Sequence, residues 1–216
     1  MKTQLFTLIL TLLLLVSFSN ETYQMAMAKS IEKLFQAKSI TEYVDLANQF
    51  ERISKNEKTE WLPLYYASFA YVMISFQETE NAKKDVYLDQ AQKFLDQAFQ
   101  IEPNESELHL MQAFIYPSRI NIDPMGRGAI YIGALNKSLD TAIELNPDNP
   151  RPYYLRATMI LYTPEAYGGG AARSLPMFRT AKEKFDNFKP QTAIFPNWGN
   201  EMNEAEMEKL NKIVKQ

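Results

Sequence analysis

Apolar side chains recur every three or four residues along most of the chain, the spacing of one buried face of a helix. In one segment the predicted buried set is Tyr43, Leu46, Ala47, Phe50 and Ile53. In a later segment it is Leu88, Ala91, Leu95, Ala98 and Ile101. Only 7 glycines in 216 residues argue against a fold rich in β-turns. The pattern therefore predicts an all-α protein.

The predicted helices end at a stop signal that recurs. The stretch "AIELNPDNP" at 142–150 matches "AFQIEPNES" at 98–106, so that Pro147 lies 44 residues after Pro103. Pro190 follows after another 43 residues. The residue before a proline is driven out of the helical conformation, so each proline marks a helix end. A stop signal at a fixed interval predicts a repeat array.

Small residues recur at the same interval as the prolines. Within each repeat, an alanine follows a ring by four residues in the first helix, and an alanine follows a leucine by three in the second. Close approach of two helices needs a small side chain where they cross, so these alanines are predicted to lie at helix crossings. The set comprises Ala70, Ala113 and Ala157 in first helices and Ala98 and Ala142 in second helices, and the rings are Tyr66, His109 and Tyr153.

These signals predict a helix-pair solenoid, because a single pair cannot bury its own apolar face. We expect one domain over residues 20–216, with helix pairs at about 29–55, 60–103, 105–147 and 150–190 and a C-terminal cap helix at about 200–215. Long loops are expected inside three pairs, at "QETENAKKD", "PSRINIDPMGRG" and "TPEAYGGGAAR".

The alanine pattern and the "AIELNPDNP" boundary resemble the tetratricopeptide repeat (TPR) over roughly residues 39–190. That family repeats about every 34 residues, whereas this chain needs 43–44. The stretches "EWLPLYYASFAY", "YTPEAYGGG" and "FPNWG" also resemble a group of exported tetratricopeptide-like proteins of Bacteroidetes. This resemblance implies a fold and a compartment and names no activity.

The first residues are typical of a secretory signal peptide. Lys2 precedes an apolar stretch of 12 residues, Leu5–Val16, which is too short to cross a membrane. Cleavage after Ser19, giving a signal peptide at 1–19, is predicted over cleavage after Ala28. With no cysteine there is no lipid-attachment site, so we expect a periplasmic or secreted product without stable membrane insertion after cleavage.

Composition excludes several classes of function. The net charge of −3 comes without a basic block, so a nucleic-acid partner is not expected. The chain has no cysteine and one histidine, so neither a metal site nor a cofactor is expected. No credible group of nucleophile, base and oxyanion donors is present, so no catalytic residue is assigned and the protein is not expected to be an enzyme.

Aromatic residues off the predicted core faces are the remaining signal. In the tetratricopeptide family the first helices line a concave groove, and the residues that would then face it are Tyr71, Phe114, Arg151, Tyr154 and Tyr162. Rings together with arginine are frequent in binding hot spots. We therefore expect a non-enzymatic module that binds a peptide or protein segment. The alternative is a small-solute-binding or transport accessory protein of the cell envelope.

A glycine loop offers a second candidate site. Gly168, Gly169 and Gly170 precede the predicted helix that carries Arg173. Exposed N–H groups at a helix start favour anions, but the phosphate-loop pattern and a preceding strand are both missing. An anion site is therefore the minor interpretation, and a connector that allows a tight reversal of the chain is the major one.

Overall fold

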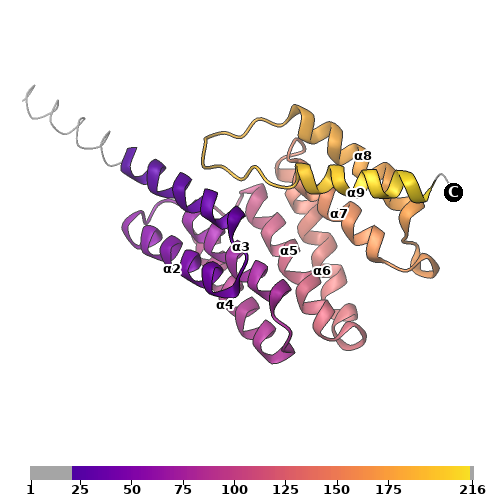
Figure 1. Ribbon diagram of the computed structural model, residues 1–216, viewed down its shortest axis with the longest axis horizontal. Coiled ribbons are helices and arrows are strands. Elements are labelled where there is room, and N and C mark those ends of the chain that lie inside the picture. The colour runs from indigo at the N-terminus through magenta and orange to yellow at the C-terminus, as the bar shows by residue number, and fades with distance from the viewer. Residues whose placement is uncertain (1–20, 215–216) are drawn as a thin grey trace, which may run out of the picture.

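The computed structural model describes residues 21–214, and this part of the chain is helical without strands (Figure 1). The predicted signal peptide at 1–19 lies outside the described residues. A first helix covers 21–36. The others are α2 (Ile40–Asn56), α3 (Leu62–Gln77), α4 (Asn81–Ile101), α5 (Ser106–Ile122), α6 (Pro124–Leu145), α7 (Pro150–Tyr162), a 3-10 turn (Glu165–Tyr167), α8 (Ala171–Asn187) and α9 (Asn200–Ile213).

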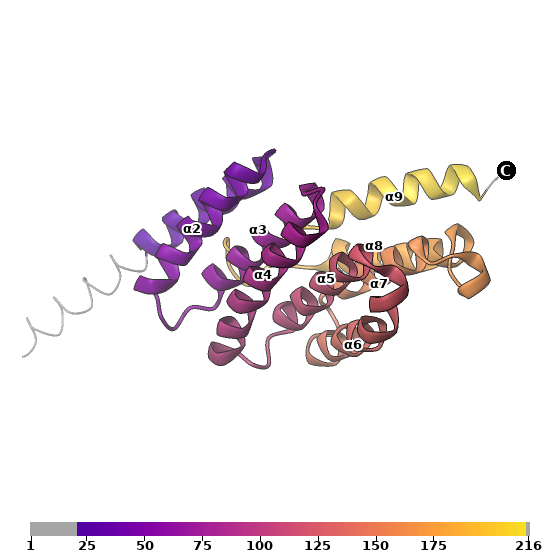
Figure 2. The same cartoon turned by 90° about the horizontal axis from the view of Figure 1, so that it is seen from below.

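Successive helices form antiparallel pairs that stack along the chain. The helix at 21–36 pairs with α2, α3 with α4, α5 with α6 and α7 with α8, and α9 packs against α8. In the view turned by 90°, α5 and α7 lie in the middle, with α6 on one side of them and α9 on the other (Figure 2). The prediction of an all-α helix-pair solenoid with a C-terminal cap helix is confirmed.

The prediction of long loops inside the pairs is wrong for two of the three pairs. Only residues 78–80 separate α3 from α4, and only Asp123 separates α5 from α6. The additional residues of each repeat lengthen the helices instead. Asp123 starts α6 directly, because its side chain accepts a hydrogen bond from the N–H of Gly126 at 3.0 Å and Pro124 suits the first helical position. The connection between α7 and α8, residues 163–170, is a loop as expected.

Contacts between neighbouring repeats hold these extended helix ends. The guanidinium group of Arg127 in α6 donates two hydrogen bonds to the carboxylate of Asp85 in α4, both at 2.7 Å. Arg119 of α5 bonds Asp89 of α4 at 2.7 Å. Within the pair of α5 and α6, Tyr116 and Tyr131 stack with ring centroids 5.5 Å apart. The additional turns therefore have partners of their own, both across the repeat boundary and within the pair.

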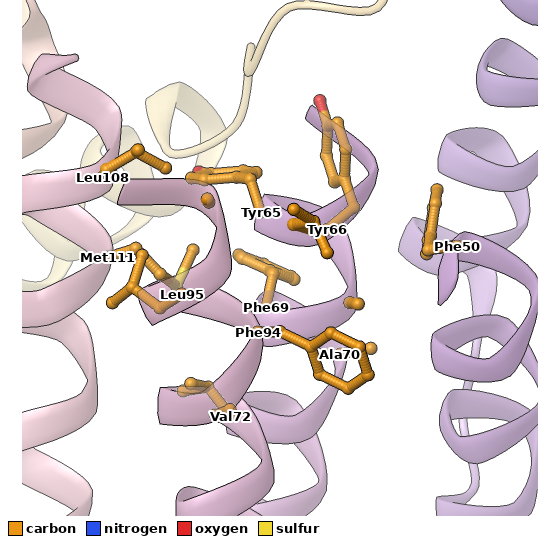
Figure 3. Packing of buried hydrophobic residues seen from close by; sticks show 14 of the residues in the cluster. Phe50, Tyr65, Tyr66, Phe69, Ala70, Val72, Phe94, Leu95, Leu108 and Met111 are labelled. Carbon is orange, nitrogen blue, oxygen red and sulfur yellow. The ribbon is translucent and has the colours of Figure 1, made fainter. Parts of the chain in front are cut away.

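The core is built from residues at the predicted repeat positions. All five alanines predicted at helix crossings are 0% exposed, as close packing of helices there requires. Phe50 of α2 stacks on Tyr66 of α3 at 5.4 Å, and Leu108 and Met111 of α5 face the side chains of α3 and α4 (Figure 3). Helices α4 and α6 end two residues before Pro103 and Pro147, as the stop signals predict.

Among the described helices, none combines the length and the apolar character that a membrane crossing requires.

Candidate functional site

Five aromatic side chains from separate parts of the chain form a continuous contact surface, which we call the aromatic strip. Phe35 comes from the first helix, Phe69 and Phe76 from α3, and Phe114 from α5. Phe69 and Phe76 lie seven residues apart, two helical turns, and therefore share one face of α3. Trp198 comes from the segment before α9.

Each ring of the aromatic strip contacts at least one other ring of the strip. Phe69 lies 5.7 Å from Phe35, 6.0 Å from Phe114 and 5.4 Å from Trp198, measured between ring centroids. Phe114 lies 5.6 Å from Trp198 and 5.5 Å from Phe76. Phe69 and Trp198 are buried, whereas Phe35 and Phe76 are each 48% exposed. The aromatic strip is therefore packed at its centre and open to solvent at two edges.

Trp198 belongs to residues 188–199, which connect α8 to α9 and which we call the C-terminal strap. Ile194, Phe195 and Trp198 are at most 6% exposed, although the C-terminal strap contains no helix. The hydroxyl of Tyr66 donates to the carbonyl oxygen of Ile194 at 3.0 Å. The indole N–H of Trp198 donates to the hydroxyl of Tyr65 at 2.8 Å. Part of the chain therefore covers the first turns of α3.

Gly199 allows the C-terminal strap to turn into α9. Its φ of 106° lies in the left-handed region that favours glycine. A Cβ atom there would lie 2.8 Å from the ring of Phe185, closer than a carbon contact permits. Glycine therefore permits both the turn and the close approach of the C-terminal strap to α8.

A buried polar cluster lies beneath the C-terminal strap. The carboxylate of Glu107 in α5 and the guanidinium of Arg151 in α7 pair at 2.6 Å, with side chains 1% and 0% exposed. The side-chain amide of Asn149 also donates to Glu107 at 2.6 Å, and the hydroxyl of Tyr65 donates to it at 3.4 Å. Arg151 lies 4.6 Å from the ring centre of Phe188, a cation–π contact. The cluster therefore joins α3, α5 and α7 to the C-terminal strap.

The chain is similar to the HusA haemophore from Porphyromonas gingivalis, with 26% sequence identity, a TM-score of 0.79, and coverage of 90% of this chain and 95% of that one. It also matches a thermophilic TPR protein of Thermus thermophilus, with 16% identity, a TM-score of 0.48, and coverage of 88% of this chain and 99% of that one. No family model and no curated protein sequence matches the chain.

The haemophore comes from a member of the Bacteroidetes, and its similarity covers nearly the whole of both chains. The resemblance to helical-repeat proteins of that group is confirmed.

The structure places Arg151 differently from the sequence-based expectation. We expected its side chain in an open groove, but it is 0% exposed and paired with Glu107. The expectation failed because charged residues are seldom fully buried unless they are paired, and the partner lies 44 residues away. That separation equals the repeat interval, so a comparison of equivalent positions in successive repeats reveals the opposite charges.

The four predicted groove rings divide among three environments. Tyr71 stacks on Phe94 of α4 at 5.8 Å, and Tyr154 packs against Phe178 of α8 at 6.1 Å, so both lie inside their own helix pairs. Both rings are half-buried, and these contacts do not favour a place in an open groove. Phe114 lies on the aromatic strip. Tyr162, at the end of α7, is 74% exposed.

The sequence analysis missed four of the five members of the aromatic strip. The available signal is the seven-residue spacing of Phe69 and Phe76 on a helix, together with the aromatic Trp198 in "FPNWG".

The glycine loop has the geometry of a connector. Its N–H groups are used internally: Gly168 donates to Glu165, Gly169 to Pro164 and Gly170 to Ile160, at 2.9 to 3.2 Å. Arg173 donates to the carbonyl oxygen of Gly168 at 3.2 Å. The N–H groups of the three glycines are therefore already engaged, and the geometry favours the connector.

His109 lies apart from the aromatic strip. Its ring packs edge-on against Phe99 at 5.0 Å, and its Nε2 contacts the carbonyl oxygen of Pro103 at 3.2 Å. Burial lowers the pKa of His109 below its usual value. Within residues 21–214, no cluster of three or more histidine, aspartate or glutamate side chains is placed to hold a metal ion.

A surface pocket of about 600 Å³ lies between α8, the turn before α7 and the C-terminal strap. Its walls include Asp148, Glu183, Lys184 and Lys189, so they carry both signs of charge. Two rings, Phe188 and Phe195, contribute to it. This pocket is more polar than the aromatic strip and shows no preference for one class of charged ligand.

Proposed function

We propose that this protein is an exported, non-enzymatic carrier that binds a flat, largely apolar ligand of the haem or porphyrin class at the aromatic strip. The observation that carries the proposal is the similarity to a haemophore at 26% identity over 90% of the chain. The aromatic strip gives that similarity a physical counterpart on the described residues. This function corresponds to the solute-binding alternative of the sequence analysis.

The aromatic strip suits a planar ligand. Phe35 and Phe76, each 48% exposed, flank the buried centre formed by Phe69 and Trp198. Aromatic side chains bury large areas and favour offset-stacked or edge-to-face contacts with other rings. A flat macrocycle placed against the exposed edges would remove both phenylalanines from water.

Iron ligation by histidine or cysteine has no support at the aromatic strip. The chain has no cysteine, and its single histidine packs against Phe99. Haem iron is commonly held by histidine, cysteine, methionine or tyrosine. The five side chains of the aromatic strip are phenylalanines and a tryptophan, none of which is such a ligand. We therefore expect recognition through the faces of the macrocycle, so a metal-free porphyrin should bind with an affinity similar to that of haem.

A peptide or protein segment in an open groove is the other candidate ligand. The C-terminal strap already covers the first turns of α3, where it engages the buried hydroxyls of Tyr65 and Tyr66. A peptide would have to bind beside the C-terminal strap or displace it. This alternative is retained as an outcome of the binding test.

Export with cleavage after Ser19 is part of the proposal. Tyr23 and Met27 are 6% and 0% exposed and belong to the hydrophobic core. Cleavage after Ala28 would remove both, which supports the earlier site. An intact-mass measurement on protein from the cell envelope should give a chain that starts at Asn20. A chain that starts at Lys29, or a mass for all 216 residues, would contradict the cleavage after Ser19.

The binding test is a titration of the purified mature protein with haem, with metal-free protoporphyrin and with a pool of unselected peptides. We expect saturable binding of both macrocycles, measured by the shift of their main absorption band. Saturable binding of peptides alone would replace the proposal by the peptide-groove function. Binding of haem without binding of the metal-free macrocycle would show that the iron is recognised directly.

A further inference from the structure

We propose that Tyr65, Glu107 and Arg151 form a positioning unit that fixes the indole of Trp198 in the aromatic strip and thereby sets the affinity for the planar ligand. This inference rests on the proposed function. It adds a role for three buried residues that lie behind the aromatic strip and need not touch the ligand.

The indole is the one member of the aromatic strip that the repeat helices do not supply. It fills the space between Phe69 and Phe114, at 5.4 Å and 5.6 Å, although its backbone belongs to the non-helical C-terminal strap. Ring contacts alone tolerate several orientations, because both offset-stacked and edge-to-face arrangements are favourable. The hydrogen bond from the indole N–H to the hydroxyl of Tyr65, at 2.8 Å, selects one of them.

The hydroxyl of Tyr65 is itself oriented. It donates its single proton to Glu107, which leaves its lone pairs to accept from the indole. The ring is held edge-on by Trp61 and Tyr66, at 5.8 Å and 5.1 Å. Burial, and next the negative charge of Glu107, raise the pKa of Tyr65 well above its usual value, so the hydroxyl keeps its proton.

Glu107 is fixed in turn by charged and neutral donors. Nε of Arg151 donates to both carboxylate oxygens, at 2.9 and 3.0 Å, and Nη2 donates at 2.6 Å. Glu107 and Arg151 both lie in the first turn of their helices, 44 residues apart, and Arg151 also contacts Phe188 at the other end of the C-terminal strap. The unit thus links both ends of the C-terminal strap to one set of helix starts.

The cost of burying these charges supports a positioning role. A buried ion pair seldom stabilises a fold more than apolar residues of similar volume would. In this network Nε and Nη2 of Arg151 are bonded to Glu107, whereas its buried Nη1 has no hydrogen-bond partner. The bonds that are made favour a single geometry. In this chain the geometry that they favour is the orientation of Trp198.

The experiment uses the mature protein with Trp61→Phe, which leaves Trp198 as the only tryptophan. Tyr65→Phe is compared with Tyr66→Phe, its neighbour, whose hydroxyl holds the carbonyl of Ile194 and not the indole. Without ligand, Tyr65→Phe should shift the emission maximum of Trp198 and change its quenching by acrylamide. Tyr66→Phe should leave both close to those of the Trp61→Phe protein.

Affinity for protoporphyrin is measured on the same proteins. A net hydrogen bond of about 0.5–1.5 kcal/mol corresponds to a loss of roughly two- to tenfold in affinity. We expect a loss in that range for Tyr65→Phe and a smaller change for Tyr66→Phe. Equal affinities of Tyr65→Phe and the Trp61→Phe protein would overturn the proposal.

A double-mutant cycle separates positioning from a general structural effect. Trp198→Phe removes the indole N–H, so adding Tyr65→Phe should then cause little further loss of affinity. An undiminished loss in that background would assign Tyr65 a general structural role and overturn the proposal. The emission measurement needs no ligand, so the expected shift without any porphyrin binding would refute the proposed function, and the ligand role of the unit with it.

Discussion

Arg151→Met tests the buried ion pair directly. The substitution removes the guanidinium and leaves the carboxylate of Glu107, 1% exposed, with Asn149 and Tyr65 as its remaining donors. Breaking a buried pair by removing one partner costs about 3–5 kcal/mol, and two retained donors favour the lower end. Methionine keeps an apolar contact with Phe188, so the loss reports mainly on the pair. At roughly 2–4 °C per kcal/mol for a chain of this size, the melting temperature should fall by about 6–12 °C.

Two further variants make this prediction specific. Arg156→Met, on the same helix, breaks a pair whose side chains are 30% and 58% exposed, and should cost less than about 1 kcal/mol. Adding Glu107→Gln to Arg151→Met should restore part of the loss, because the buried charge is then gone. Chemical denaturation measures all four proteins, including Glu107→Gln alone. A cost below about 1 kcal/mol for Arg151→Met, or simple additivity in the double variant, would refute the reasoning.

Three other substitutions test the packing and the charge of the repeats. Ala142→Leu should cost about 1–3 kcal/mol in chemical denaturation because Ala142 is 0% exposed, whereas Ala129→Leu on the exposed side of α6 should change little. Gly169→Ala should lower the melting temperature, because its Cβ would lie 2.0 Å from the carbonyl oxygen of Thr163, whereas Gly133→Ala, with open space in α6, should raise it. His109→Gln should remove a loss of stability that the wild type shows as the pH falls below the ordinary pKa of histidine, about 6.5. The pKa of His109 is lowered in the folded state, so the unfolded chain takes up the proton first, and urea melts between pH 7 and 5 measure the difference.

The fold was predictable because its signals are local and repeated. Proline stops and crossing alanines recur every 43–44 residues, and each of these signals can be read from the sequence of a single helix. The sequence did not predict that two of the expected loops are helical. Their helical structure depends on contacts such as Arg127 with Asp85, which join residues of different repeats and leave no periodic mark.

The candidate site was predictable only in part, since it depends on the path of the C-terminal strap. Phe114 was identified from its position on a first helix. Trp198 reaches the aromatic strip through a non-helical segment, and no periodicity specifies where such a segment packs. Arg151 was misplaced because burial of its charge depends on Glu107, in a different repeat.

The most direct test of the proposed site compares haem binding by the wild type with binding by a Phe35→Ala/Phe76→Ala variant. Both rings are 48% exposed, so their removal should leave the fold largely intact, and Ile130→Ala/Ile132→Ala, at 67% and 50% exposure on α6, is the matched control. Titration by absorbance should show saturable binding by the wild type and the control, and a loss of at least about tenfold for the phenylalanine variant, in line with binding hot spots that each contribute about 1 kcal/mol or more. Unchanged affinity in the phenylalanine variant, or no saturable binding by the wild type, would contradict the assignment of the aromatic strip as the ligand site.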